Sequence, residues 1–125
     1  MAIVDDEIDL ACLFRDALSQ IDGIQVLAFS DPHLFLEHFE VNHQYYRVVI
    51  SDYRMPEMNG IELLEKTKSI NSSVLRMMVS AFEIQDQVFG SCNCVDKFLQ
   101  KPIKMSDIKT EVQKQMNSIK IQNKG

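Results

Sequence analysis

Short apolar runs alternate with helical patterns along the whole chain, and this alternation restricts the fold more than any other feature. The runs lie at about residues 2–4, 25–29, 48–51, 74–79 and 97–100. Between them, apolar residues recur at spacings of three and four, as on a helix with one buried face. Strands that alternate with helices favour right-handed βαβ units, and therefore a parallel sheet with helices on both faces.

Two of the segments between the runs carry specific helix signals. Asp31 followed by Pro32 predicts a helix with an N-cap aspartate and a first-turn proline. Ser106 is the expected cap of a last helix that runs to about Met116. The segment after the first run predicts a buried helical stripe of Leu10, Leu13, Phe14, Ala17, Leu18 and Ile21.

Polar side chains follow most of the predicted strands. They are Asp5 and Asp6, Asp52, Ser80 and Lys101. Because the carboxyl ends of parallel strands share one edge of a sheet, we expect these side chains to converge there. Three carboxylates so placed would raise one another's pKa unless a cation neutralised them, and an all-oxygen ligand set suits Mg²⁺ completed by water. With a lysine and a hydroxyl beside it, such a cluster could bind a phosphoryl group and leave one carboxylate as nucleophile.

Length and composition exclude several classes of protein. The chain has 125 residues, which predicts one domain, and its net charge of −5 argues against general nucleic-acid binding. It has no apolar stretch of about 20 residues and no signal peptide, so we expect a cytoplasmic protein without membrane contact. Three cysteines are an odd count, so a disulfide framework is not expected.

Four motifs in order, "VDDE", "SDYRMPEMNG", "VSA" and "FLQKP", closely resemble the receiver domain of two-component response regulators. The resemblance runs from Ile3 to about Met116. It implies a flavodoxin-like (CheY-like) fold, which is a doubly wound α/β fold. Its five-stranded parallel sheet has the order 2-1-3-4-5, with five helices on both faces. We expect a receiver domain over residues 1–118, and a polar tail or the start of a linker over residues 119–125.

The resemblance also implies a chemistry for the strand ends. Asp52 is expected to accept a phosphoryl group from a histidine kinase or a phosphotransfer protein. Asp6 and Asp52, with the main-chain carbonyl of Arg54, are expected to bind Mg²⁺, and Asp5 to act through a metal-bound water. A receiver of this kind is a signalling domain and not an enzyme, and its partner is a downstream protein or a C-terminal output domain.

Three further residues have implied roles in the response to phosphorylation. Lys101 is expected to pair with the phosphoryl oxygens, Ser80 to turn toward them after transfer, and Phe98 to bury its ring in response. The chain departs from the family pattern before the fifth strand, where a small Gly-Ala pair is usual and Cys94-Val95 stands instead. The preceding segment also has poor helix propensity, so we expect a short, shifted or mobile fourth helix.

Two alternatives remain open at this point. One is a degenerate receiver that acts as an interaction module independent of phosphorylation. The other is an enzyme with an aspartate nucleophile, such as a phosphatase of the haloacid dehalogenase type. Those enzymes carry Asp-x-Asp at the nucleophile, whereas this chain reads Asp52-Tyr53-Arg54.

Overall fold

A five-stranded parallel sheet forms the centre of the computed structural model, with the strands in the order β2-β1-β3-β4-β5. The model describes residues 1–21, 23–80, 94–101 and 103–124, and their side chains as far as residue 117. The strands are β1 (Ala2–Val4), β2 (Leu27–Phe29), β3 (Val48–Asp52), β4 (Leu75–Ser80) and β5 (Lys97–Gln100). This order confirms the predicted doubly wound sheet.

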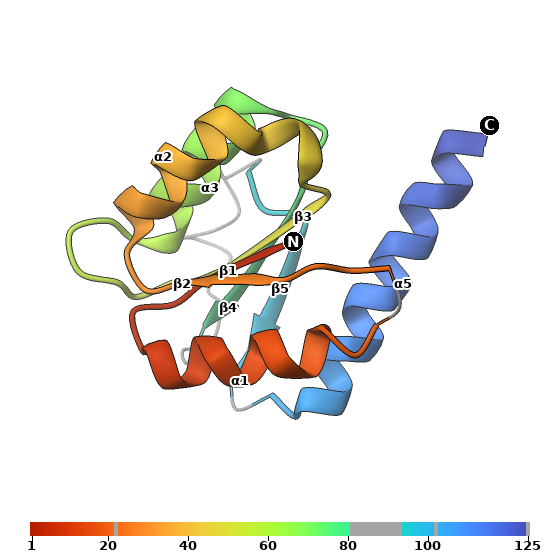
Figure 1. Ribbon diagram of the computed structural model, residues 1–125, viewed down its shortest axis with the longest axis horizontal. Coiled ribbons are helices and arrows are strands. Elements are labelled where there is room, and N and C mark those ends of the chain that lie inside the picture. The colour runs from red at the N-terminus through yellow and green to blue at the C-terminus, as the bar shows by residue number, and fades with distance from the viewer. Residues whose placement is uncertain (22, 81–93, 102, 125) are drawn as a thin grey trace.

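Helices cover both faces of the sheet. Figure 1 shows α1 and α5 on one face and α2 and α3 on the other. The helices are α1 (Ile8–Leu18), α2 (Pro32–Asn42), α3 (Gly60–Ile70) and α5 (Met105–Lys124), with a 3-10 turn, η1, at His43–Tyr45. The predicted fourth helix lies on residues 81–93, outside the described residues. Within the described part of the chain, no helix is long and apolar enough to cross a membrane.

β3 is the central strand, and its sequence explains its position. Val48, Val49 and Ile50 are all buried, because helices cover both faces of the strand. β1 and β4 pair with it in parallel, with Val4 opposite Ser51 and Asp52 opposite Val79. This register brings the carboxyl ends of the three strands to the same level.

The core consists of one cluster on each face of the sheet. Phe35 and Phe39 from α2 pack with Leu63 and Leu64 from α3 in one cluster. Helices α1 and α5 contribute to the other cluster with Ala11, Phe14, Leu18, Ile108 and Val112. The prediction that Leu13 is buried is wrong, because its side chain is 56% exposed. α1 buries the stripe of residues 11, 14 and 18, and each step along a helix turns the side chain by about 100°.

The predicted helix caps had different outcomes. Asp31 caps α2 as predicted, and its Oδ1 accepts from the main-chain N of His33 at 2.9 Å. Ser106 is not a cap, because α5 begins at Met105. The same helix continues to residue 124, well beyond the end that the sequence predicts.

Cysteine pairing also differs from the expectation. Cys94 is disulfide-bonded, whereas Cys12 is a free thiol. Cys92 lies outside the described residues. An odd number of cysteines excludes the pairing of all three but not of two, so the count was a weak argument against a single bridge.

Candidate functional site

Three carboxylates meet at the carboxyl ends of β1 and β3. Asp5, Asp6 and Asp52 each offer one oxygen, and these oxygens lie within 4.8 Å of one another. Asp5 is buried, Asp52 is half-buried and Asp6 is exposed. The structure therefore brings together the acidic residues that the sequence placed at the strand ends.

Lys101 reaches this carboxylate cluster from the end of β5, the strand at one edge of the sheet. Its Nζ lies 3.3 Å from Asp5 Oδ2 and 3.1 Å from Asp52 Oδ1. The backbone sets this position, because Lys101 directly follows β5 and its main-chain N donates to the carbonyl of Ser80 at 2.7 Å. One ammonium group thus faces three carboxylates.

The pKa values of these groups reflect this imbalance. Burial raises the pKa of Asp5, although hydrogen bonds from Glu7 N and Lys101 oppose the rise. Burial also raises the pKa of Asp52, and repulsion from Asp5 adds to the rise. For Lys101, burial lowers the pKa, but attraction to Asp5 and Asp52 outweighs it and the net shift is upward. The cluster therefore carries more negative charge than its single lysine offsets.

The donor set of the cluster fits a hard divalent cation. Every candidate ligand atom is a carboxylate oxygen, as Mg²⁺ prefers. Asp6 makes no hydrogen bond or ion pair within the described residues, so its carboxylate is available. Asp5 already accepts from Glu7 N through Oδ1 and contacts Lys101 through Oδ2, so it suits an indirect role.

The loop between β3 and α3 closes tightly on Asp52. A Cβ at Gly60 would lie 2.5 Å from the main-chain oxygen of Asp52, and the Gly60 N–H donates to the Tyr53 carbonyl at 2.8 Å. Only glycine permits this approach. Asn59 then caps α3 by accepting from Glu62 N at 2.9 Å. The Asn-Gly pair at the end of "SDYRMPEMNG" is the sequence signal for this turn.

The same loop borders an open hollow beside the carboxylate cluster. Its volume is about 400 Å³, and it is lined by Asp6, Tyr53, Arg54, Met55, Pro56 and Asn59. Arg54 and Asp6 therefore border the same hollow, and the role of the Arg54 carbonyl as a metal ligand stays a prediction.

Ser80 and Phe98 lie on the two strands nearest Lys101. Ser80 ends β4 and is 1% exposed, opposite Gln100 of β5. Phe98 is partly buried and packs against the core cluster of α2 and α3. Ser80 therefore contacts the Lys101 backbone, while Phe98 faces the helical layer.

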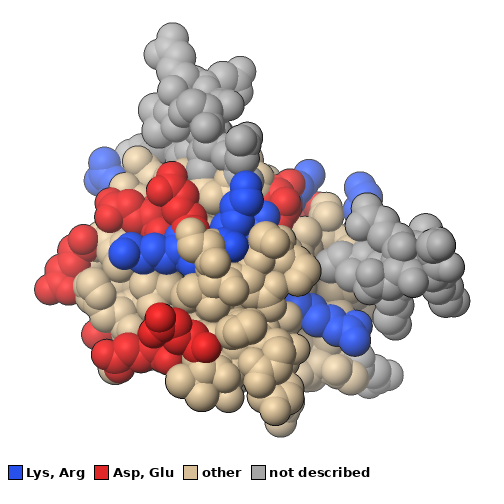
Figure 2. Space-filling model, turned by 90° about the horizontal axis from the view of Figure 1, so that it is seen from above, with Lys and Arg blue, Asp and Glu red and all other residues tan. Residues whose placement is uncertain are grey.

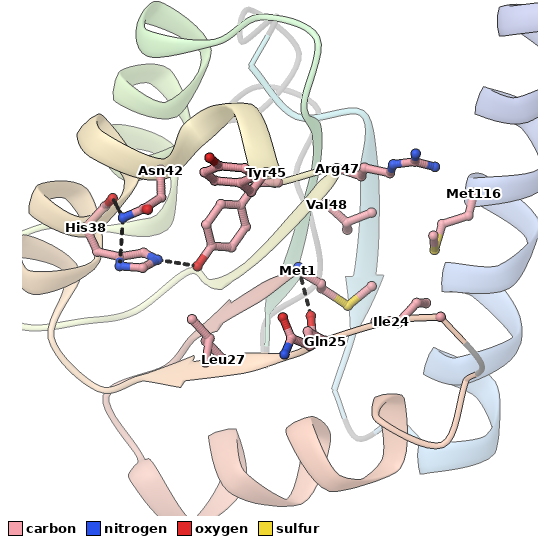
Figure 3. Close-up of a pocket in the computed structure, with 12 residues that line it drawn as sticks. Met1, Ile24, Gln25, Leu27, His38, Asn42, Tyr45, Arg47, Val48 and Met116 are labelled. Atoms are coloured by element: carbon pink, nitrogen blue, oxygen red, sulfur yellow. Dashed lines mark hydrogen bonds between the residues drawn. The ribbon is translucent and has the colours of Figure 1, made fainter.

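A larger hollow lies at the amino ends of the strands, opposite to the carboxylate cluster, as Figure 3 shows. Its volume is about 700 Å³, and residues before β1 and at the start of β3, Met1 and Val48, help to line it. His38 Nε2 lies 2.6 Å from the Tyr46 hydroxyl in its wall. This hollow shares no residue with the carboxylate cluster. Choosing the functional site by volume alone would therefore miss the charged site.

Charged side chains are mixed on the face that Figure 2 draws. Basic side chains lie among acidic ones there, and the residues coloured on that face form no continuous basic surface. Proteins that bind the phosphate backbone of nucleic acids usually do so through a continuous basic surface.

Comparison with known proteins agrees with the geometry. The family model for the response regulator receiver domain matches residues 1–113. The transcriptional regulatory protein CpxR homolog of Haemophilus influenzae is 29% identical over 102 residues, which are 82% of this chain and 43% of that protein. The two-component response regulator ARR16 of Arabidopsis thaliana is 27% identical over 100 residues, or 78% of this chain and 61% of that protein.

Solved structures show the same fold. A CheY-like receiver domain protein from Methanospirillum hungatei superposes with a TM-score of 0.85 at 21% identity, covering 97% of this chain and 95% of that chain. A receiver domain from Clostridium thermocellum gives a TM-score of 0.84 at 25% identity, covering 96% and 95%. From the family match over most of its length, we conclude that the chain belongs to the response regulator receiver domain family.

Proposed function

We propose that this receiver accepts a phosphoryl group on Asp52 from a histidine kinase or a phosphotransfer protein, in a Mg²⁺-dependent reaction. The observation that carries the proposal is the position of Lys101, whose ammonium contacts both Asp5 and Asp52 beside the exposed carboxylate of Asp6. Three carboxylates and one ammonium group thus lie together at one sheet edge, which supports the roles proposed for them.

The proposed Mg²⁺ ligands are Asp6, Asp52 and the main-chain carbonyl of Arg54, with Asp5 acting through a bound water. When bound, Mg²⁺ supplies positive charge that offsets the carboxylates and the incoming phosphoryl oxygens. The excess of carboxylates over lysine at the cluster supports this assignment.

In the transfer step, an Asp52 carboxylate oxygen bonds to phosphorus while the bond from phosphorus to the donor histidine nitrogen breaks. The electron pair of the broken bond stays with the imidazole, which then takes up a proton. Lys101 moves little, because it already lies 3.1 Å from Asp52, and its ammonium pairs with a phosphoryl oxygen. Ser80 then donates to another oxygen.

The response to phosphorylation is proposed to pass through Ser80 and Phe98, with Phe98 burying its ring further. The output is a downstream protein or a C-terminal domain. The chain spans 43% and 61% of the lengths of two curated relatives. The activities of those whole proteins are therefore not assigned to this chain. We propose residues 1–118 as the receiver unit, in the cytoplasm, without direct contact to nucleic acid or membrane. The α5 helix continues across the boundary at residue 118.

Intact-mass measurement after incubation with acetyl phosphate and Mg²⁺ tests the proposal. The wild-type chain should gain one phosphoryl group, and Asp52→Asn should gain none, because a neutral amide of nearly the same shape cannot attack phosphorus. Asp9→Asn, an exposed aspartate of α1, is the matched control and should label like wild type.

The same experiment separates the alternatives. An unlabelled wild-type chain that still binds a partner would favour the degenerate receiver. Continuous turnover of phosphomonoesters would favour a phosphatase. Labelling that persists in Asp52→Asn would place the acceptor at another residue.

A further inference from the structure

Arg76 is an arginine buried within the sheet. It lies in β4 and is 5% exposed, although its neighbours on that strand are Leu, Met and Val. Its Nε donates to the carbonyl of Cys94 at 2.7 Å, and Nη1 donates to the carbonyls of Val74 and Ser72 at 2.7 and 3.1 Å. These bonds compensate for much of the desolvation that a buried guanidinium requires.

Asp96 completes the link between β4 and the chain that enters β5. Its Oδ2 accepts from the Arg76 main-chain N at 2.8 Å and lies 3.6 Å from Arg76 Nη2. The Asp96 main-chain N in turn donates to the Arg76 carbonyl at 2.7 Å. Backbone and side chain of both residues therefore join at one point, directly before β5 begins.

β5 is a short strand at the edge of the sheet. It has four residues, three of them half-buried and one exposed, and only Phe98 and Leu99 of the strand pack against the core clusters. A slip of one residue would move its side chains by about 3.3 Å along the strand and turn each to the other face. Lys101 follows β5 immediately, so any slip of the strand would carry its ammonium away from Asp5 and Asp52.

We propose that Arg76 and Asp96 are a positioning pair, which sets the register of β5 and thereby places Lys101 against Asp52. The pair controls the rate of phosphoryl transfer, and this inference rests on the proposed function. The pair does not position the proposed Mg²⁺ ligands, because these come from the ends of β1 and β3 and from the loop that follows β3. Loss of the pair should therefore slow phosphoryl transfer without weakening Mg²⁺ binding, whereas general destabilisation would impair both.

The first test compares Arg76→Met with Val112→Ala, a core substitution in the cluster on the other face of the sheet. The Met side chain fills much of the space of Arg76 without its hydrogen bonds. Labelling by acetyl phosphate should slow about 10- to 100-fold in Arg76→Met, as expected when a catalytic group is misplaced by an ångström or so. Its Mg²⁺ affinity by calorimetry should stay close to wild type, and Val112→Ala should label at close to the wild-type rate.

A double-mutant cycle with Lys101→Met gives the sharper test. If Arg76 acts through Lys101, Arg76→Met should slow labelling no further in a Lys101→Met chain, because acetyl phosphate transfer then no longer depends on the lysine. Equal slowing in both backgrounds would overturn the proposal, as would a wild-type rate in Arg76→Met. Should Arg76→Met not fold, Asp96→Asn provides the milder variant, with smaller slowing expected by the same route.

A crystal structure of the variant keeps this inference distinct from the proposed function. If the wild-type chain is not labelled at all, the proposed function fails, and the positioning pair is then judged on coordinates alone. Lys101 Nζ should move out of contact with Asp52 in Arg76→Met. A lysine that keeps its wild-type contact would overturn the pair's role.

Discussion

Arg76 and Lys101 both pair with carboxylates at the sheet, and the two arrangements differ in their balance of charge. Arg76 is met by one carboxylate and three carbonyls, which together accept from most of its guanidinium. Lys101 faces Asp5 and Asp52 in contact, with the exposed Asp6 beside them. We call the first arrangement closed, because its charges nearly balance, and the second open, because it carries excess negative charge.

The contrast separates architecture from chemistry. A buried charge whose hydrogen bonds are satisfied has nothing further to bind, so it acts on the fold. A cluster with excess negative charge is held by the surrounding fold in a state that a bound cation can relieve. Four substitutions test this distinction, and they follow from the largest expected effect to the smallest.

Breaking the closed arrangement should cost the most stability. Arg76→Ala leaves three carbonyls without their guanidinium donor, while Asp96 keeps only its bond from the main-chain N, and the free energy of unfolding should fall by about 2–4 kcal/mol. Urea denaturation followed by circular dichroism measures the change. A loss below about 1 kcal/mol would mean that the hydrogen bonds of Arg76 contribute little to the stability of the fold.

Removing one acid from the open cluster should instead affect metal binding. Asp6→Ala takes away a ligand and part of the negative field, so Mg²⁺ affinity should fall by about tenfold or more, or about 1.4 kcal/mol. Calorimetric titration measures it, with Asp96→Asn as the matched control from the closed arrangement. Equal affinity in Asp6→Ala and wild type would remove Asp6 from the ligand set.

The open cluster should also make stability fall as pH rises. A carboxyl whose pKa is raised in the folded chain, as for Asp52, holds its proton more tightly there than in the unfolded chain. Its contribution to stability is therefore present at low pH and is lost as pH rises from about 4, the ordinary aspartate value, through the raised value.

In metal-free buffer, Asp52→Asn should therefore become more stable than wild type as pH approaches about 7, and the gap should narrow at low pH or with added Mg²⁺. Thermal unfolding at several pH values measures this gap. A gap that widens toward low pH would reverse the sign of the effect and contradict the excess charge.

A residue outside both arrangements should give the smallest effect. Glu57 has a backbone φ of 69°, which residues other than Gly, Asn and Asp rarely adopt. Glu57→Asn should stabilise the chain by about 0.5 kcal/mol, partly offset by loss of the exposed contact with His33. Urea denaturation measures the gain, and labelling by acetyl phosphate should not change; slower labelling would mean that this loop position shapes the site.

The sequence predicted the sheet well because strand ends and helix periods are local signals. The convergence of Asp5, Asp6, Asp52 and Lys101 could be predicted because parallel topology brings strand ends together, whereas their chemical roles stay a prediction. Leu13 was misplaced since its spacing fits the stripe, while only the packed α1 shows which side of the stripe meets the sheet. The interstrand role of Arg76 could not be predicted, because its partner, Asp96, is twenty residues away and no local pattern joins them.

The Lys101 contacts described above also bear on how the chain folds. Lys101 meets Asp5 across a separation of 96 residues, so the contact closes nearly the whole chain. Contacts of such long range form late, after local structure and the rest of the sheet exist. A nascent or partly unfolded chain can hold β1 and β3 together and still lack the lysine. On the proposed function, competence for phosphorylation therefore requires the completely folded chain and would report that synthesis has passed residue 101.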